Sequence, residues 1–360
     1  MGVLDKLLEK EEFYQSDISE LLSLSSKTDV EKLFKKAYEV KTAFVGRTVY
    51  FRGIIEMSNI CFKNCRYCGI RKDNRNIDRY MMNEKEILDA ARWCYESGYG
   101  SVVIQSGERD DSEFANFVTK IVRNIKELSG GKLGITLSLG EQDKETYRRW
   151  FEAGAHRYLL RIETSNKELY KKLHPESHCF SDRYRCLGML REEGYQVGTG
   201  VMIGLPGQTA EDLASDVMFF RDNDIDMIGM GPYIPHPDTP MGVSIPDFSQ
   251  KKEQQLRGAL KMIAVTRIVL RDINIAAATA LQALDPVGRE MGLEAGANIV
   301  MPNVTDTKYR KNYKLYEDKP CTDENSKMCR SCLSTRIKSI GETIGFNKWG
   351  DSPHFKKKLH

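Results

Sequence analysis

The sequence lacks the features that mark membrane, secreted and nucleic-acid-binding proteins. No apolar run approaches the roughly 20 residues that a membrane-spanning helix needs. Asp5 and Lys6 fall where a signal peptide would carry its apolar core, and Lys6 stands where a myristoylation signal has Ser or Thr. The charge is nearly balanced, with 54 Lys and Arg against 51 Asp and Glu, so a nucleic-acid surface is not indicated. We therefore expect a cytoplasmic protein with neither a membrane nor a nucleic-acid partner.

Cysteine is scarce outside two short groups, which argues against a disulfide framework. The nine cysteines are odd in number, and six of them form the groups Cys61, Cys65, Cys68 and Cys321, Cys329, Cys332. Such clustering is typical of metal binding. Cys94 and Cys186 fall in expected helices and are interpreted as small buried apolar residues.

The first cysteine group has the spacing C-x3-C-x2-C and follows an apolar, β-branched run at 49–56. Three thiolates on one short loop can face a single iron–sulfur cluster, which usually takes four cysteines. One iron is then left without a protein ligand and can bind a substrate. Zinc is the alternative, but a structural zinc site needs four ligands, and no His or fourth Cys lies nearby in the sequence. An accidental cluster of buried thiols is a further alternative.

Strand-like and helix-like segments alternate from residue 49 onward. Eight apolar runs are expected to be strands: 49–56, 101–106, 133–139, 157–163, 196–203, 226–232, 274–280 and 297–302. Amphipathic segments lie between them, such as 84–97, which begins with the cap Asn83-x-x-Glu86. The alternation predicts an α/β fold, a (β/α)8 TIM barrel of parallel strands. We expect helices at 1–45 to cap its closed end, the barrel at 46–310, and a cysteine-containing extension at 311–360.

The carboxyl ends of the strands, where chemistry sits in such barrels, carry unusual residues. Polar segments follow the second and third expected strands, at 105–108 and 138–141. Arg161 and Glu163 alternate with apolar neighbours at the end of the fourth, so both side chains should point into the barrel mouth. A structural ion pair that closes the barrel is the alternative interpretation.

The cysteine loop resembles that of the radical S-adenosylmethionine (SAM) enzymes, whose signature has this spacing. Within them the sequence resembles the HydE family of [FeFe]-hydrogenase maturases, in the segments 60–74, 105–108, 136–141, 157–166, 200–209, 228–240, 288–290, 296–303 and 309–316. The resemblance implies an enzyme that uses a [4Fe–4S] cluster to cleave SAM reductively to a 5′-deoxyadenosyl radical and acts in assembly of the hydrogenase diiron centre. Methylornithine synthase is the alternative within this group. Biotin synthase is less favoured because it lines its barrel with cysteines, whereas no expected strand of this chain carries one. A non-catalytic iron–sulfur carrier is the remote alternative.

The resemblance also implies roles for individual residues. Cys61, Cys65 and Cys68 would bind the cluster, and SAM would contact Tyr67, Ser106, Gly107, Glu108, Glu163 and Arg183. Arg161 would hold an anion on the barrel axis. Tyr313 and Tyr316 would close the mouth over SAM and substrate, unless their i, i+3 spacing means that they pack on the rim. Ile162 and Ala278 depart from the family's pattern, in which a His and a Thr occur.

The second cysteine group implies an accessory site. Some HydE members bind a second iron–sulfur cluster at cysteines like Cys321, Cys329 and Cys332, and others lack them; free or zinc-bound cysteines are the alternative. The implied partners are a small anionic substrate or iron-containing precursor, an electron donor such as ferredoxin or flavodoxin, and other hydrogenase maturases.

Overall fold

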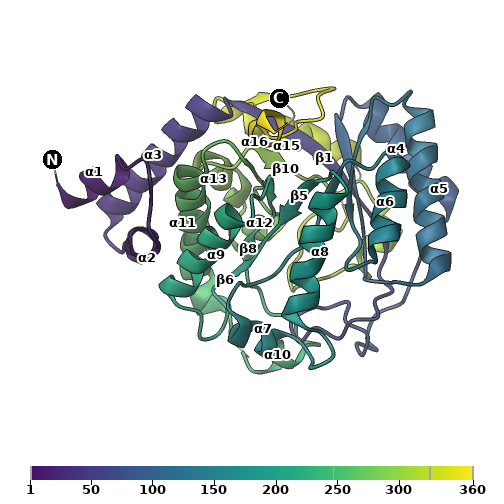
Figure 1. Ribbon diagram of the computed structural model, residues 1–360, viewed down its shortest axis with the longest axis horizontal. Helices are drawn as coiled ribbons and strands as arrows, with labels where there is room; N and C mark the ends of the chain where they lie inside the picture. Colours follow the sequence, from purple (N-terminus) through teal and green to yellow (C-terminus); the bar gives the residue numbers. More distant parts are fainter. Residues whose placement is uncertain (1, 246, 324–325, 359–360) are drawn as a thin grey trace.

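Eight parallel strands form a ring at the centre of the molecule, and helices surround it (Figure 1). The computed structural model describes residues 2–245, 247–323 and 326–358. Around the sheet the order is β10 (Ile299–Val300), β1 (Thr48–Ser58), β2 (Ser101–Ser106), β3 (Gly134–Ser138), β4 (Arg157–Leu159), β5 (Gln196–Thr199), β7 (Met227–Ile228) and β9 (Asn274–Ile275). Backbone hydrogen bonds from Ala277 N to Ile299 O and from Asn298 N to Ile275 O, both 2.9 Å, join β9 to β10. The expected (β/α)8 barrel is confirmed.

Each of the eight expected ranges contains strand, but several strands are shorter than expected. The fifth and sixth segments are interrupted and continue as β6 (Met202–Ile203) and β8 (Gly231–Pro232), which pair with each other. The expectation of strand through residue 280 is wrong, because Thr279 begins helix α12 (Thr279–Leu284). Alanine recurs at 276–278 and 280, and alanine favours helix over strand.

The outer helices bury an apolar face against the ring. They are α4 (Glu84–Glu96), α5 (Ser112–Leu128), α6 (Lys144–Glu152), α7 (Lys167–Leu173), α8 (Phe180–Glu192), α9 (Ala210–Asp222), α11 (Lys252–Leu270) and α13 (Gly288–Glu294). The cap expected before α4 is confirmed: Asn83 Oδ1 accepts from Glu86 N at 3.0 Å, and Glu86 Oε2 accepts from Asn83 N at 2.9 Å. Shorter turns at the open end are α10 (Pro240–Val243), a 3-10 turn (Ser249–Lys251) and α14 (Thr307–Arg310).

The amino-terminal helices form an arm on one flank, at the left of Figure 1. They are α1 (Val3–Leu8), α2 (Gln15–Ser23) and α3 (Lys27–Phe44), and α2 packs against α9 while α3 packs against α11. Tyr38 and Lys41 of α3 also contact Glu342, at 2.8 Å and 3.0 Å from its Oε1. The expected helical extension is therefore present on the flank of the barrel, and a second segment contacts the closed end.

The closed end of the barrel is covered by residues 349–351. The carbonyl oxygen of Gly350 accepts from Arg52 Nη2 at 3.0 Å and from Asn274 Nδ2 at 2.8 Å, and the carboxylate of Asp351 pairs with Arg157. Arg157 and Asn274 are the first residues of their strands, and Arg52 pairs in register with Ser101, the first residue of β2. The elements α15 (Ser326–Ser339), β11 (Thr343–Ile344) and α16 (Pro353–Lys357) flank this segment in sequence, and β11 pairs with β1.

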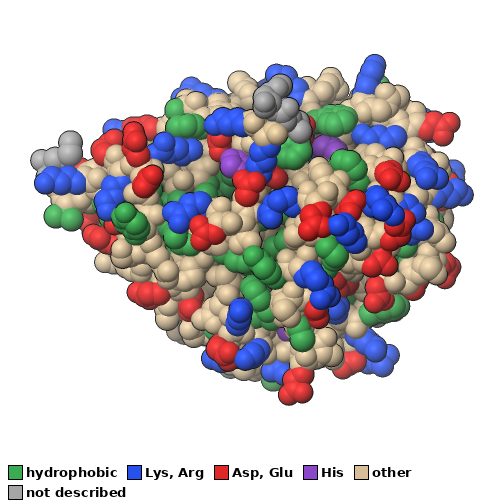
Figure 2. Space-filling model, viewed as in Figure 1, with side chains coloured by type: hydrophobic (Ala, Val, Ile, Leu, Met, Phe, Trp, Pro, Cys, Tyr) green, Lys and Arg blue, Asp and Glu red, His purple; other side chains and the backbone are tan. Residues whose placement is uncertain are grey.

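Charged side chains of both signs are interspersed over the face shown in Figure 2, as the balanced composition predicts. Within the described residues, no helix combines the length and the apolar character needed to cross a membrane.

Candidate functional site

A cavity of about 330 Å³ at the carboxyl ends of the strands brings together residues from across the chain. The residues that line it include every one proposed from the sequence for the barrel mouth: Cys61, Cys65, Tyr67, Cys68, Ser106, Gly107, Glu108, Arg161, Glu163, Arg183, Tyr313 and Tyr316. These positions come from separate strand ends and loops. The fold therefore assembles the predicted site in one place.

The cysteine loop is held in shape by hydrogen bonds to its backbone and by one close backbone contact. Arg79 donates from Nη1 to the carbonyl oxygens of Asn59 (2.7 Å) and Ile70 (2.8 Å), at the two ends of the loop. Gly107 packs against the start of the loop so closely that a Cβ there would lie 2.3 Å from the carbonyl oxygen of Ile60. Only glycine fits at this approach. Arg79 was missed by the sequence reasoning, because nothing in the local pattern shows which carbonyls it reaches.

The three loop cysteines are half-buried. Burial raises the pKa of Cys61, raises that of Cys65 well above its usual value, and raises that of Cys68 to about 12. A neighbouring thiolate adds to the effect at Cys65 and Cys68. The thiols are therefore protonated without a metal, and metal binding must displace their protons.

The donor geometry fits a cluster better than a single ion. Two thiolates on one tetrahedral zinc, with Zn–S near 2.3 Å, would lie about 3.8 Å apart. Among the described side chains, however, the group whose ligand atoms all lie within 4.8 Å of one another is Cys65, His174 and His178, and not the three cysteines. Three thiolates on three different irons need no such close approach, so the residues fit an iron–sulfur cluster.

Arg183 and Glu108 belong to a network of four charges beside the loop. Arg183 Nη2 lies 3.1 Å from Glu108 Oε2, and Arg183 Nε lies 2.7 Å from Glu141 Oε1. Lys63 Nζ approaches the same two carboxylates, at 3.3 Å from Glu108 and 2.9 Å from Glu141. Two cations and two anions leave the network neutral. Glu141 was noted in the sequence only as a polar residue after the third strand, and Lys63 was not noted.

Gly140 makes the network possible. Its φ is +83°, and a Cβ there would lie 2.1 Å from Glu108 Cγ. A side chain at this position would displace the carboxylate that Arg183 contacts.

Arg161 and Glu163 form an ion pair at the cavity wall. Arg161 Nη2 lies 2.8 Å from Glu163 Oε2, and it also donates to the carbonyl oxygen of Val201 at 3.0 Å. Glu163 has a φ of 63°, which is unusual for a residue other than glycine. Backbone bonds hold it there, from Glu163 N to Gly200 O and from Met202 N to Glu163 O. The ion pair considered from the sequence therefore exists, and both side chains also face the cavity.

Tyr313 and Tyr316 follow α14 on an irregular segment, so their spacing does not place them on one helix face. Tyr313 is only 1% exposed, and Lys319 Nζ lies 5.0 Å from its ring centroid. Burial raises its pKa well above the usual value, which keeps the phenol neutral. Tyr67 packs edge to face on His174, with ring centroids 5.6 Å apart.

Two cysteines of the second group lie outside the wall of this cavity. Among the residues that the structure describes, neither Cys321 nor Cys332 lines it. Cys321 is half-buried and its carbonyl oxygen accepts from Arg310 Nη1 at 2.8 Å, while Cys332 is exposed on α15. Cys329 lies on the same helix, and its side chain is outside the described part. The accessory site stays a prediction.

Comparison with known proteins agrees with the geometry. The family model of the radical SAM superfamily matches residues 55–220. The chain is 44% identical over 348 residues to the [FeFe] hydrogenase maturase subunit HydE of Thermotoga maritima, a match that covers 97% of this chain and 96% of that protein. It is 30% identical over 298 residues to a 3-methylornithine synthase of Methanosarcina acetivorans, covering 82% of this chain and 81% of that protein.

Solved structures share the fold over almost the whole chain. Methylornithine synthase (PylB) superposes with a TM-score of 0.80 at 25% identity, covering 96% of this chain and 98% of that one. The [FeFe]-hydrogenase maturase HydG from Carboxydothermus hydrogenoformans superposes with a TM-score of 0.78 at 18% identity, covering 96% of this chain and 78% of that one.

Proposed function

The chain belongs to the HydE family of radical SAM enzymes, and from this premise we propose that its barrel mouth binds a [4Fe–4S] cluster and SAM and serves assembly of the diiron centre of [FeFe]-hydrogenase. One observation carries the proposal. A single cavity gathers the cysteines of the loop with Glu108, Glu163 and Arg183, in a chain 44% identical to a HydE protein.

The loop cysteines Cys61, Cys65 and Cys68 would hold the cluster and leave one iron for SAM. When bound, the cluster supplies the electron for reductive cleavage of SAM, which yields a 5′-deoxyadenosyl radical. Iron would displace the protons of the three thiols. Burial raises the pKa of all three thiols, so forming the thiolates costs free energy, and bonds to iron would offset that cost.

The four-charge network would orient the amino-acid end of SAM. That end is a zwitterion, so it can enter a neutral network without changing its net charge. The ammonium would pair with Glu108 beside Ser106 and Gly107, and the carboxylate with Arg183. A guanidinium offers a planar fork that matches a carboxylate. Glu163 would contact the ribose or amino end, and Tyr67 would lie near the adenine.

The remaining wall would receive the substrate. Arg161 is a cation of the cavity wall to which no contact with SAM is assigned, so we propose that it binds a small anionic substrate or an iron-containing precursor. Tyr313 and Tyr316 would close the mouth and exclude water from the radical. An external electron donor such as ferredoxin or flavodoxin would reduce the cluster, other maturases would take the product, and the three carboxyl-terminal cysteines would hold an accessory cluster.

Gene deletion separates this function from its alternatives. Loss of [FeFe]-hydrogenase activity on deletion, restored by the parent gene, is the expected result. Loss of methylornithine synthesis with intact hydrogenase would instead assign the chain to the methylornithine synthases, with which it shares 30% identity. Biotin synthase is disfavoured, because the described cysteines that line the cavity are the three of the loop and none lies on a strand of the barrel.

A further inference from the structure

We infer that His178 donates a hydrogen bond from Nδ1 to the thiolate of Cys65 and thereby raises the reduction potential of the cluster that Cys65 holds. The inference rests on the proposed function, since it requires the cluster. His178 lies outside the cysteine loop and is not among the residues that line the cavity at the barrel mouth.

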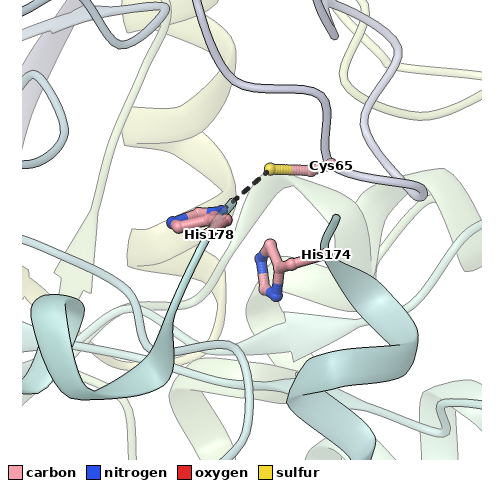
Figure 3. A group of neighbouring side chains, drawn as sticks. All are labelled: Cys65, His174 and His178. Carbon is pink, nitrogen blue, oxygen red and sulfur yellow. Dashed lines mark hydrogen bonds between the residues drawn. The ribbon is translucent and has the colours of Figure 1, made fainter. Parts of the chain in front are cut away.

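His178 stands next to the cysteine loop, as Figure 3 shows. It lies between α7 and α8, and its Nδ1 is 4.0 Å from Cys65 Sγ. The side chain of His178 is 1% exposed, so little water competes for the sulfur from this side. A backbone hydrogen bond from Arg66 N to the carbonyl oxygen of Leu173, at 2.8 Å, ties the loop to the end of α7.

The contacts of the second ring nitrogen determine where the proton is. Nε2 of His178 lies 2.7 Å from Arg183 Nη2 and 3.0 Å from Glu141 Oε1. A guanidinium can only donate, so a neutral imidazole accepts from Arg183 at Nε2 and carries its proton on Nδ1. A protonated imidazole carries protons on both nitrogens and donates to Glu141. In both arrangements Nδ1 is an N–H group that faces Cys65.

The third arrangement is unfavourable. A neutral ring protonated at Nε2 would turn that proton toward the guanidinium and would set the lone pair of Nδ1 against the thiolate of an iron-bound Cys65. The surroundings of His178 therefore select the donor form at the sulfur.

His174 provides an internal comparison, because it lies in the same group of three side chains. Its Nδ1 is 2.9 Å from the carbonyl oxygen of Tyr170, which can only accept, so His174 donates there. Burial, with the neighbouring His178, lowers its pKa to about 3, so the ring is neutral and its other nitrogen has no proton to give. His174 packs near the sulfur without a hydrogen to donate.

A hydrogen bond to a ligating sulfur favours the reduced cluster, which carries one more negative charge. His178 approaches the sulfur from outside the cavity that Cys65 lines. His178 and His174 line a second cavity of about 930 Å³ between α7, α8 and α9.

The test is a redox titration of the anaerobically reconstituted enzyme, followed by electron paramagnetic resonance. His178→Leu removes the donor and should lower the equilibrium constant for reduction about tenfold, a fall of about 59 mV for a one-electron couple. His178→Gln can still donate from its amide and should stay near the parent. His174→Leu, the matched control of equal burial, should also stay near the parent.

An unchanged potential in His178→Leu would overturn the inference, and so would an equal fall in His174→Leu. A second measurement does not depend on how well the Leu variant at 178 folds. In the His174→Leu protein labelled with 15N at histidine, pulsed resonance on the reduced cluster should show a 15N coupling, and its absence would overturn the inference. If the parent protein assembled no [4Fe–4S] cluster at all, the proposed function itself would fail, which iron and sulfide analysis would show separately.

Discussion

The guanidinium of Arg161 lies 2.8 Å from the carboxylate of Glu163, and both side chains line the cavity that holds the cysteine loop. Glu163 adopts a left-handed backbone conformation, which costs on the order of 1 to 3 kcal/mol and persists where the surroundings enforce it. Such strain is common at functional sites. In the absence of ligand, the carboxylate of Glu163 neutralises Arg161, and an anionic ligand can take the place of that carboxylate.

Arg161→Lys separates binding of substrate from binding of SAM. Lysine keeps the charge but loses the planar fork. We expect SAM binding and basal SAM cleavage to persist while maturation of hydrogenase falls roughly tenfold or more, the loss expected when a charged hydrogen bond of about 1.5 to 3 kcal/mol is removed. Unchanged maturation, or equal losses of SAM binding and maturation, would show that Arg161 does not serve the substrate.

Cys65→Ala should abolish the SAM-binding cluster, because two thiolates cannot replace three. The readouts are iron and sulfide content and release of 5′-deoxyadenosine after anaerobic reduction with SAM. Cys179→Ala is the matched control, since Cys179 is exposed and lies outside the loop, and it should behave as the parent. Release of 5′-deoxyadenosine at the parent rate by Cys65→Ala would refute the assignment of the loop.

The triple variant Cys321→Ala, Cys329→Ala, Cys332→Ala should keep SAM cleavage and most maturation activity. Neither Cys321 nor Cys332 is among the described residues of the cavity wall, so a cluster there would be an accessory. Iron and sulfide content should fall while the 5′-deoxyadenosine yield holds. Complete loss of maturation in a variant that remains folded would make the second site catalytic.

Asp216 should make stability depend on pH. It is fully buried on α9, its Oδ1 accepts from Ser165 N and Oγ at 2.6 Å, and burial raises its pKa from 3.8 to about 7. The folded state therefore binds a proton that the unfolded chain has lost between these two pH values. The contribution of Asp216 to stability is full below about pH 4 and is lost as the pH rises through about 7.

Asp216→Asn removes this titration. At roughly 1.4 kcal/mol per pH unit, the free energy of unfolding of the parent should fall by about 2 to 3 kcal/mol relative to the Asn variant between pH 5 and pH 8. Urea unfolding of both proteins at the two pH values measures the difference. The same pH dependence in both would mean that Asp216 is ionised in the folded protein.

Asp351→Asn tests the segment that covers the closed end. Asp351 pairs with the fully buried Arg157, and although burial opposes it, the hydrogen bond to His156 and the charge of Arg157 hold the pKa of Asp351 well below its usual value. Removing the charge leaves Arg157 unpaired, which should cost about 3 to 5 kcal/mol in the free energy of unfolding. Glu168→Gln, which breaks a fully exposed pair with Lys171, should leave the free energy of unfolding almost unchanged. Equal effects would show that residues 349–351 do not stabilise the barrel.

The sequence by itself determined the features that depend on neighbours in the chain. The spacing of Cys61, Cys65 and Cys68 predicted the metal loop, and Asn83 with Glu86 marked the start of a helix. Each of these follows from the covalent geometry of a few residues. Arg161 and Glu163 were expected on a strand that points them into the mouth; they face the cavity, but from the segment after β4. The alternation of apolar strand-like runs with amphipathic segments, repeated eight times along the chain, predicted the barrel.

Only the tertiary structure decided which distant side chains meet. Glu108 and Arg183 are 75 residues apart, and Cys65 and His178 are 113 apart. Residues 349–351 reach the closed end from the far side of the sequence, which no local pattern indicates. Such contacts form where folding would otherwise leave buried donors, acceptors or charges without a partner. An unpaired buried group costs more free energy than ordering the segment that pairs with it.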